Sequence, residues 1–98
     1  MYIIRFSKQA DKDKGLLKGA GLDLKAKGLL NIIAENPFQN PPPYEGLVGS
    51  LNGYYSRRIN IQHRLVYQVY SNPVVIEGIE YEGTIKVVRM WSHYDAVR

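Results

Sequence analysis

The chain has 98 residues, a formal net charge of +4 at pH 7 and no cysteine. This length allows one small core, so we expect residues 1–98 to form a single domain. The lack of cysteine excludes disulfides and thiolate metal sites and allows a reducing, cytoplasmic location. The positive charge favours a polyanionic or acidic partner. No apolar run approaches the ~18 residues that span a bilayer, and Met1–Arg5 does not begin a secretory signal, so we expect no membrane role.

A short strand and two helices are predicted in the first part of the chain. Tyr2–Phe6 alternates as a strand, and Ser7 can cap a helix that runs to about Ala20. The Gly19–Gly21 break separates this helix from a second one, which ends before Pro37 because proline cannot continue a helix. The apolar residues of the second helix recur on one face, which must cover a sheet: Leu22, Ala26, Leu29, Leu30 and Ile33.

The segment from Asn36 to Tyr44 is rich in proline. It contains Pro37 and the run Pro41–Pro43, which suit neither a helix nor a central strand. We therefore expect an extended, stiff connector that delivers Glu45 to a defined place.

Further strands are predicted in the second half of the chain. They are Tyr54–Asn60, Arg64–Tyr70 with a continuation through Val74–Glu80, and Thr84–Ser92, with turns at Asn60–His63 and Tyr81–Gly83. The element order is β-α-α-β-β-β. We predict an α+β fold, in which a small, mostly antiparallel sheet of four to five strands carries the two N-terminal helices on one face.

Arginines on the predicted strands are unusual. Arg57, Arg58 and Arg64 lie in a stretch, Gly46–Ile76, that contains no Asp or Glu. A guanidinium is planar, always charged and suited to bidentate contact with phosphate. Close sequence neighbours cannot neutralise all of these charges, so we predict a cationic surface that binds an anion. The alternative is a set of structural ion pairs with Glu77, Glu80 or Glu82.

Strand alternation assigns these side chains to faces of the sheet. Ser56, Arg58 and Asn60 share one face of their strand, and Arg57 lies on the other. On the next strand, Arg64, Val66 and Gln68 are predicted to point away from the helices.

The last strand is predicted to add a histidine to the same open face. There Arg89, Trp91 and His93 would point together, although a register slip of one residue would reverse this assignment. The residues predicted to meet on the open face are Glu45, Arg58, Arg64 and His93.

Three stretches of the chain resemble one protein family. They are Asn36–Glu45, Tyr55–Tyr67 and Arg89–Tyr94. They closely resemble Txe/YoeB-type toxins of bacterial toxin–antitoxin modules, within the RelE superfamily, and the likeness covers nearly the whole chain. The resemblance implies a RelE-like fold and a ribosome-dependent endoribonuclease that cuts mRNA in the decoding site. It also implies neutralisation by a cognate acidic antitoxin.

The resemblance also implies roles for individual residues. Cleavage of RNA through its own 2′-hydroxyl needs a base, an acid and cations that hold the charge on phosphate. Glu45 matches the family's base, and His93 matches its acid, a role suited to imidazole with its reference pKa of ~6.5. Arg58 and Arg64 match its phosphate-stabilising arginines. Tyr94 matches its C-terminal tyrosine, which orients the histidine or stacks on a base.

Two further expectations concern the binding surface and metals. Arg57, beside Arg58, is predicted to add to the substrate-binding surface. No metal or other cofactor is expected, because no acidic cluster suggests Mg²⁺ or Ca²⁺ and the His residues are few and separated.

Other interpretations remain open from the sequence. A toxin of the same superfamily that binds a protein target such as gyrase needs neither acid nor base, and the presence of both Glu45 and His93 argues against it. A catalytically weakened module could use the basic sheet only to bind RNA or an antitoxin. A homodimer is compatible with either. Taken without the resemblance, Glu45 is a solvated loop residue, His63 is a turn residue and Trp91 is a packing residue.

The chain also departs from the family. Relatives commonly carry a lysine shortly after the base, whereas Gly46–Val48 is uncharged, which predicts one phosphate or rRNA contact fewer and a lower activity. The segment Ser71–Gly83 is longer than the short hairpin of compact members, and Asp95–Arg98 extends past their usual end.

Overall fold

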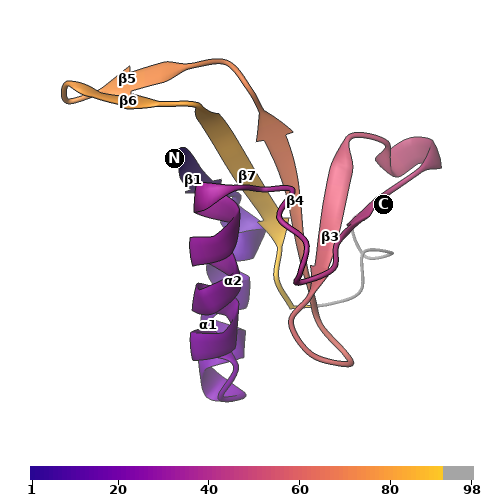
Figure 1. The fold of residues 1–98 in the computed structure, drawn as a ribbon. Coiled ribbons are helices and arrows are strands. Elements are labelled where there is room, and N and C mark those ends of the chain that lie inside the picture. The colour runs from indigo at the N-terminus through magenta and orange to yellow at the C-terminus, as the bar shows by residue number, and fades with distance from the viewer. Residues whose placement is uncertain (92–98) are drawn as a thin grey trace.

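The computed structural model describes residues 1–91. Its elements in chain order are β1 (Tyr2–Phe6), α1 (Lys8–Gly19), α2 (Asp23–Glu35), β2 (Glu45–Gly46), the 3₁₀ turn η1 (Gly49–Leu51), β3 (Tyr54–Arg58), β4 (Arg64–Tyr70), β5 (Val74–Ile76), β6 (Ile79–Tyr81) and β7 (Gly83–Arg89). Figure 1 shows these elements as two helices beside a sheet. The α+β fold predicted from the sequence is confirmed.

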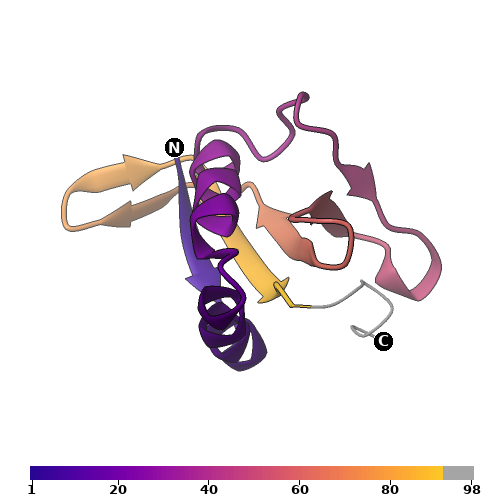
Figure 2. The ribbon, with the colours of Figure 1, turned by 90° about the horizontal axis from the view of Figure 1, so that it is seen from below.

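The main sheet has five strands in the order β1-β7-β4-β3-β2. The pairing of β1 with β7 is parallel, and the other pairings are antiparallel. Helix α1 packs on β7 and α2 packs on β1, so both helices cover the same half of one face (Figure 2). The strands β3 and β2 extend beyond the helices, and this is where the candidate site lies.

The helices form where the sequence predicts them. The Ser7 side chain caps α1 and accepts a hydrogen bond from the backbone N–H of Ala10 at 3.0 Å. The apolar face of α2 enters the core through Ala26 and Ile33, which are 2% and 0% exposed. Burying a side chain of the size of Ile33 stabilises the fold by about 1.5–3 kcal/mol. The sheet side of this core consists of Ile59, Leu65, Tyr67, Ile85, Val87 and Met90.

A separate hairpin replaces the predicted continuation of β4. The expected strand Val74–Glu80 is interrupted, because Glu77 and Gly78 have φ angles of 52° and 80° and turn the chain back. The strands β5 and β6 pair antiparallel and project away from the helices (Figures 1 and 2). The hairpin turn thus lies at Glu77–Gly78, and at the predicted turn Tyr81–Gly83 the chain only bends at Glu82 between β6 and β7.

Gly83 instead begins β7 in close contact with the end of β4. A Cβ atom at this position would lie 2.0 Å from the carbonyl oxygen of Tyr70. Only glycine allows the two backbones to approach so closely.

The face opposite the helices carries a second small apolar cluster. Leu47, Leu51 and Val66 are buried there, and Tyr54 and Val88 pack against them. Val66 does point away from the helices, as alternation predicts, but η1 and its flanks cover it. This face is therefore only partly open to solvent. Within residues 1–91, no helix has both the length and the apolar character needed to cross a bilayer.

Arg89 does not join the open face as predicted. Its Nε donates to the Oδ2 of Asp13 in α1 at 3.0 Å, and the backbone N–H of Met90 donates to the same oxygen at 2.9 Å. The faces still alternate along β7, because Val87 lies in the core under the helices, Val88 packs in the opposite cluster and Arg89 is back on the helix side. The face predicted for Arg89 was therefore wrong, and the pairing of β4 with β7 shifts next to it, between Val66 and Tyr67.

Candidate active site

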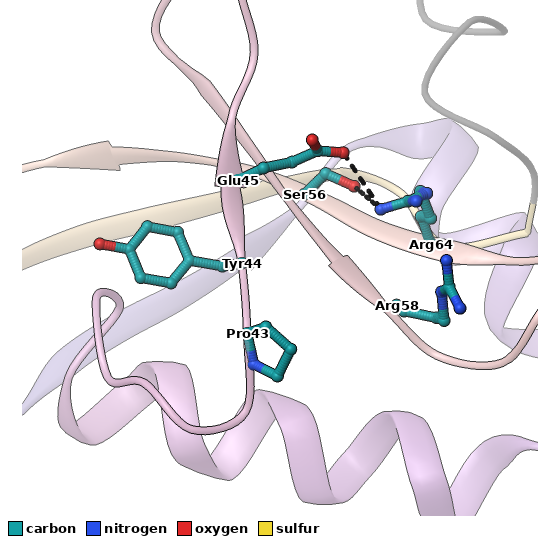
Figure 3. A pocket seen from close by; sticks show the side chains of 6 residues that line it. All are labelled: Pro43, Tyr44, Glu45, Ser56, Arg58 and Arg64. Carbon is teal, nitrogen blue, oxygen red and sulfur yellow. Dashed lines mark hydrogen bonds and ion pairs between the residues drawn. The ribbon is translucent and has the colours of Figure 1, made fainter.

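An open pocket lies between the end of the proline-rich connector and the strands β2, β3 and β4. Its volume is about 420 Å³, and Figure 3 shows the side chains that line it. They are Pro43, Tyr44, Glu45, Ser56, Arg58 and Arg64. Three of the predicted site residues, Glu45, Arg58 and Arg64, are thus brought together around one space.

The strand register explains why these side chains meet. Glu45 pairs with Ser56 across β2 and β3, and Arg58 pairs with Arg64 across β3 and β4. Directly paired residues in an antiparallel sheet point to the same face. The predicted common face for Arg58 and Arg64 is therefore confirmed, and so is the arrival of Glu45 at its edge.

Glu45 and Arg64 form an ion pair. The Nη1 atom of Arg64 lies 3.2 Å from Oε1 of Glu45 and donates a second, longer hydrogen bond of 3.3 Å to Oγ of Ser56 (Figure 3). The Arg64 side chain is 21% exposed and that of Glu45 is 52% exposed. Because the carboxylate is half in water, the pair contributes at most about 1 kcal/mol to stability. A second anion could therefore replace the Glu45 carboxylate as the partner of Arg64 at little cost in free energy.

Arg58 adds a second cation to the pocket. It is exposed and ends β3, and Figure 3 shows its guanidinium directed toward the same side as that of Arg64. A phosphate in the pocket could accept hydrogen bonds from either fork.

Arg57 does not line this pocket. It is 1% exposed, on the opposite face of β3, so its burial argues against the predicted role in binding substrate. Its Nε donates to the hydroxyl oxygen of Tyr67 at 3.1 Å, and its terminal nitrogens donate to backbone carbonyls of the connector. Alternation assigned Arg57 to the correct face but could not show that the connector covers it.

Aromatic side chains near Arg57 also hold the connector in place. Phe38, Tyr44 and Tyr55 form a cluster with ring centroids 5.1 to 6.1 Å apart. The Tyr67 hydroxyl donates to the carbonyl of Pro37 at 2.8 Å. Burial raises the pKa of the Tyr67 phenol above its ordinary value, and the neighbouring Arg57 guanidinium offsets part of this rise.

His63 and Trp91 form a stack that the sequence did not indicate. Their rings lie 4.0 Å apart at 16°. The predicted turn before His63 is confirmed, since Oδ1 of Asn60 accepts hydrogen bonds from the backbone N–H groups of Gln62 and His63 at 2.9 and 2.7 Å. The stack and the Asp13 contacts fix the chain at Met90 and Trp91, shortly before the predicted acid.

Two predicted site residues lie outside the described part of the chain. These are His93 and Tyr94, and their predicted roles remain predictions. Among residues 1–91, no group of three or more His, Cys, Asp or Glu side chains is arranged to hold a metal ion.

The comparison with known families decides the family of the chain. A family model described as a YoeB-like toxin of a bacterial type II toxin–antitoxin system matches residues 18–94. The chain belongs to this family. The YoeB-like assignment agrees with the resemblance identified in the sequence, and the match includes Glu45, Arg58 and Arg64 together with residues 93 and 94.

Individual YoeB proteins are similar in sequence and in structure. Toxin YoeB of Synechocystis sp. is 44% identical over 64 residues, which cover 65% of this chain and 67% of the relative. The structure of a YoeB dimer from Staphylococcus aureus superimposes with a TM-score of 0.73 at 34% identity and covers 95% of this chain and 98% of that one. A YoeB–YefM complex from the same organism gives a TM-score of 0.69 at 33% identity and covers 96% and 99%.

Proposed function

We propose that this YoeB-like toxin is a metal-independent endoribonuclease that cleaves mRNA on the ribosome and so inhibits translation. The observation that carries the proposal is the grouping of one carboxylate, Glu45, with Arg58 and Arg64 around an open pocket. A base beside two cations is what transfer of a phosphoryl group to a neighbouring hydroxyl requires. The family assignment supports the same reaction class.

The proposed reaction uses the RNA's own 2′-hydroxyl as nucleophile. Glu45 accepts the proton of this hydroxyl as the 2′-oxygen attacks the adjacent phosphorus. Arg64 and Arg58 hold the nonbridging oxygens, where negative charge grows. His93 donates a proton to the departing 5′-oxygen, so the bond from phosphorus to that oxygen breaks without releasing a free alkoxide. The first product of this step is a 2′,3′-cyclic phosphate.

The ion pair between Glu45 and Arg64 suggests how substrate prepares the base. Arg64 holds Glu45 at 3.2 Å. A phosphate that enters the pocket competes for the Arg64 guanidinium, because bidentate contact with phosphate is a strong hydrogen-bonded pairing. The Glu45 carboxylate then becomes available to accept the 2′-hydroxyl proton.

We further propose that an acidic antitoxin neutralises the toxin and that both act in the cytoplasm. No Asp or Glu occurs from Gly46 to Ile76, so the site surface attracts a partner rich in acidic residues. The YoeB of S. aureus is found in a complex with YefM and also as a dimer, which supports an antitoxin partner and a homodimer here.

Cleavage of ribosome-bound mRNA distinguishes this function from its competitors. A toxin that binds gyrase, or a module that only binds RNA, would leave such mRNA intact. We expect the wild-type chain to cut it and to leave uncut an otherwise identical mRNA with a 2′-deoxy sugar at the scissile position. Equal cutting of the deoxy substrate would mean that water or a metal hydroxide attacks, and the roles of Glu45 and His93 would then be wrong.

A further inference from the structure

Arg57 occupies a closed cage of oxygen acceptors. Its Nη2 donates to the carbonyl oxygens of Pro37 at 3.0 Å and Gln39 at 2.8 Å, and its Nη1 donates to that of Pro42. Its Nε donates to the hydroxyl of Tyr67 at 3.1 Å. No carboxylate of residues 1–91 forms an ion pair with Arg57. The buried charge is instead balanced by backbone carbonyl dipoles.

Three of these four acceptors belong to the connector. Residues 36–44 are in neither helix nor strand, so regular backbone pairing does not fix them. The Arg57 fork replaces that pairing, because it joins three connector carbonyls to β3 with one side chain. Tyr67 adds a second link from β4 to Pro37.

The connector ends where the candidate base begins. Tyr44 lies beside Arg57, with its ring centroid 4.9 Å from the guanidinium carbon, and Glu45 follows directly. On the opposite face of β3, Ser56 pairs with Glu45 and contacts Arg64. Neighbouring residues of β3 thus hold the connector on one face and meet the candidate base and its cation on the other.

A buried guanidinium such as that of Arg57 is not explained by its contribution to stability alone. A buried cation loses its hydration, and apolar residues of similar volume often stabilise a protein equally well. A forked donor with fixed geometry has a different advantage, which is that it sets the direction of several acceptors at once. Such supporting residues determine whether a catalytic group is held within a fraction of an ångström of its working geometry.

We propose that Arg57 is a positioning residue, which fixes the connector so that the Glu45 carboxylate stands at the correct distance from Arg64 and Ser56. The proposal rests on the function proposed above for Glu45. A displacement of about 1 Å of a catalytic group costs on the order of 10²-fold in rate. Removing the Arg57 fork should therefore slow the cleavage step and leave the binding of ribosome-bound mRNA nearly unchanged.

The test compares Arg57→Lys, which keeps the charge but not the fork, and Arg57→Ala with the wild type. In single-turnover cleavage of ribosome-bound mRNA, we expect both variants to be about 10- to 100-fold slower at saturation, with an unchanged half-saturating concentration. Added guanidinium ion at low millimolar concentration should restore part of the rate of Arg57→Ala, because it refills the cage. Ile85→Val, a core change on β7 away from the connector, is the control for general destabilisation.

Hydrogen exchange gives a readout that does not depend on cleavage. The backbone N–H of Leu47 donates to the carbonyl of Tyr54 at 2.8 Å and reports how firmly the segment after Glu45 is held. We expect its exchange to accelerate in Arg57→Lys and Arg57→Ala but not in Ile85→Val. If wild-type protein did not cleave mRNA, the proposed function would fail, while this exchange would still decide whether Arg57 holds the segment.

Two results would overturn the proposal. One is a folded Arg57→Lys or Arg57→Ala protein with wild-type cleavage and wild-type exchange at Leu47. The other is a loss of rate no larger than that of Ile85→Val and not restored by guanidinium, which would mean that Arg57 is merely structural. If neither Arg57 variant folds, Tyr67→Phe decides the question by the same measurements, because it removes only the hydroxyl that links Arg57 Nε to Pro37.

Discussion

The Nη1 atom of Arg64 on β4 lies 3.2 Å from Oε1 of Glu45 on β2, although another strand, β3, runs between them. The side chains bridge β3 across Ser56, which accepts a hydrogen bond from the same nitrogen at 3.3 Å. The candidate base and the arginine proposed to bind phosphate are therefore in direct contact. This contact couples their proposed roles.

Arg64→Ala should abolish cleavage of ribosome-bound mRNA and leave the fold intact. The Glu45 carboxylate that Arg64 contacts is about half exposed to water. We therefore expect the free energy of unfolding to change by no more than about 1 kcal/mol. Expression of the variant without antitoxin should be tolerated by cells. Arg5→Ala, an exposed change on β1 at the far edge of the sheet, is the matched control and should remain toxic. Arrest of cells by folded Arg64→Ala would show that its assigned role is wrong.

Asp13→Asn should destabilise the protein through the start of its C-terminal segment. The Asp13 carboxylate is fully buried and accepts hydrogen bonds from Arg89, from the Met90 backbone and from Gln9. An amide cannot satisfy all of these donors, so we expect a loss of about 1–3 kcal/mol in urea unfolding. Asp11→Asn is the control, because its carboxylate is 61% exposed and, within residues 1–91, pairs with Lys14 alone, so its loss should stay within about 0.5 kcal/mol. Equal losses in the two variants would contradict this account.

The local elements were predictable because their signals are local. The N-cap at Ser7, the apolar face of α2 and the alternation of β4 each depend on residues within one element. The pairing of Arg58 with Arg64 followed from a short turn between adjacent strands. These signals were enough to assign Glu45, Arg58 and Arg64 to one site.

Contacts between distant segments were not predictable in the same way. Period-two alternation gives the face of Arg57 but not what covers that face, and the cover is the connector. The Asp13–Arg89 contact joins α1 to the end of β7 and places Arg89 on the helix side with Val87, so the prediction failed in the face it assigned to the last strand. The β5–β6 hairpin was missed because its turn is Glu77–Gly78, without the Asn or Asp that usually marks such turns.

Association with the proposed acidic antitoxin should slow as ionic strength rises. The site surface carries Arg58 and Arg64, and attraction between exposed charges is screened over about 10 Å at 0.1 M salt. Stopped-flow measurement of the association rate between low and moderate salt should show a clear decrease. Arg58→Gln should reduce both the rate and its salt dependence, whereas Arg5→Gln should change them less. An association rate indifferent to salt would exclude electrostatic attraction as its cause.

Tyr67→Phe should change how stability depends on pH in the alkaline range. Burial raises the pKa of Tyr67 in the folded protein, so the unfolded chain releases this proton at a lower pH than the folded one. Its contribution is therefore fully present below about pH 10 and is lost as pH rises further, by up to about 1.4 kcal/mol per pH unit. Urea unfolding between pH 9 and 11 should show a steeper decline for wild type than for Tyr67→Phe. Parallel declines would show that Tyr67 does not titrate in this way.

The proposed base and the proposed acid should make the cleavage rate fall at opposite ends of the pH range. Glu45 must be ionised to accept the 2′-hydroxyl proton, so the rate should fall at low pH, and His93 must be protonated to donate, so the rate should fall at high pH. His93→Gln keeps a hydrogen-bond donor but has no transferable proton. We expect it to lower the single-turnover rate by about 10²- to 10⁴-fold and to remove the alkaline decline. Arg5→Gln should keep the wild-type profile. A His93→Gln protein that keeps both its rate and its alkaline decline would require another acid in the reaction.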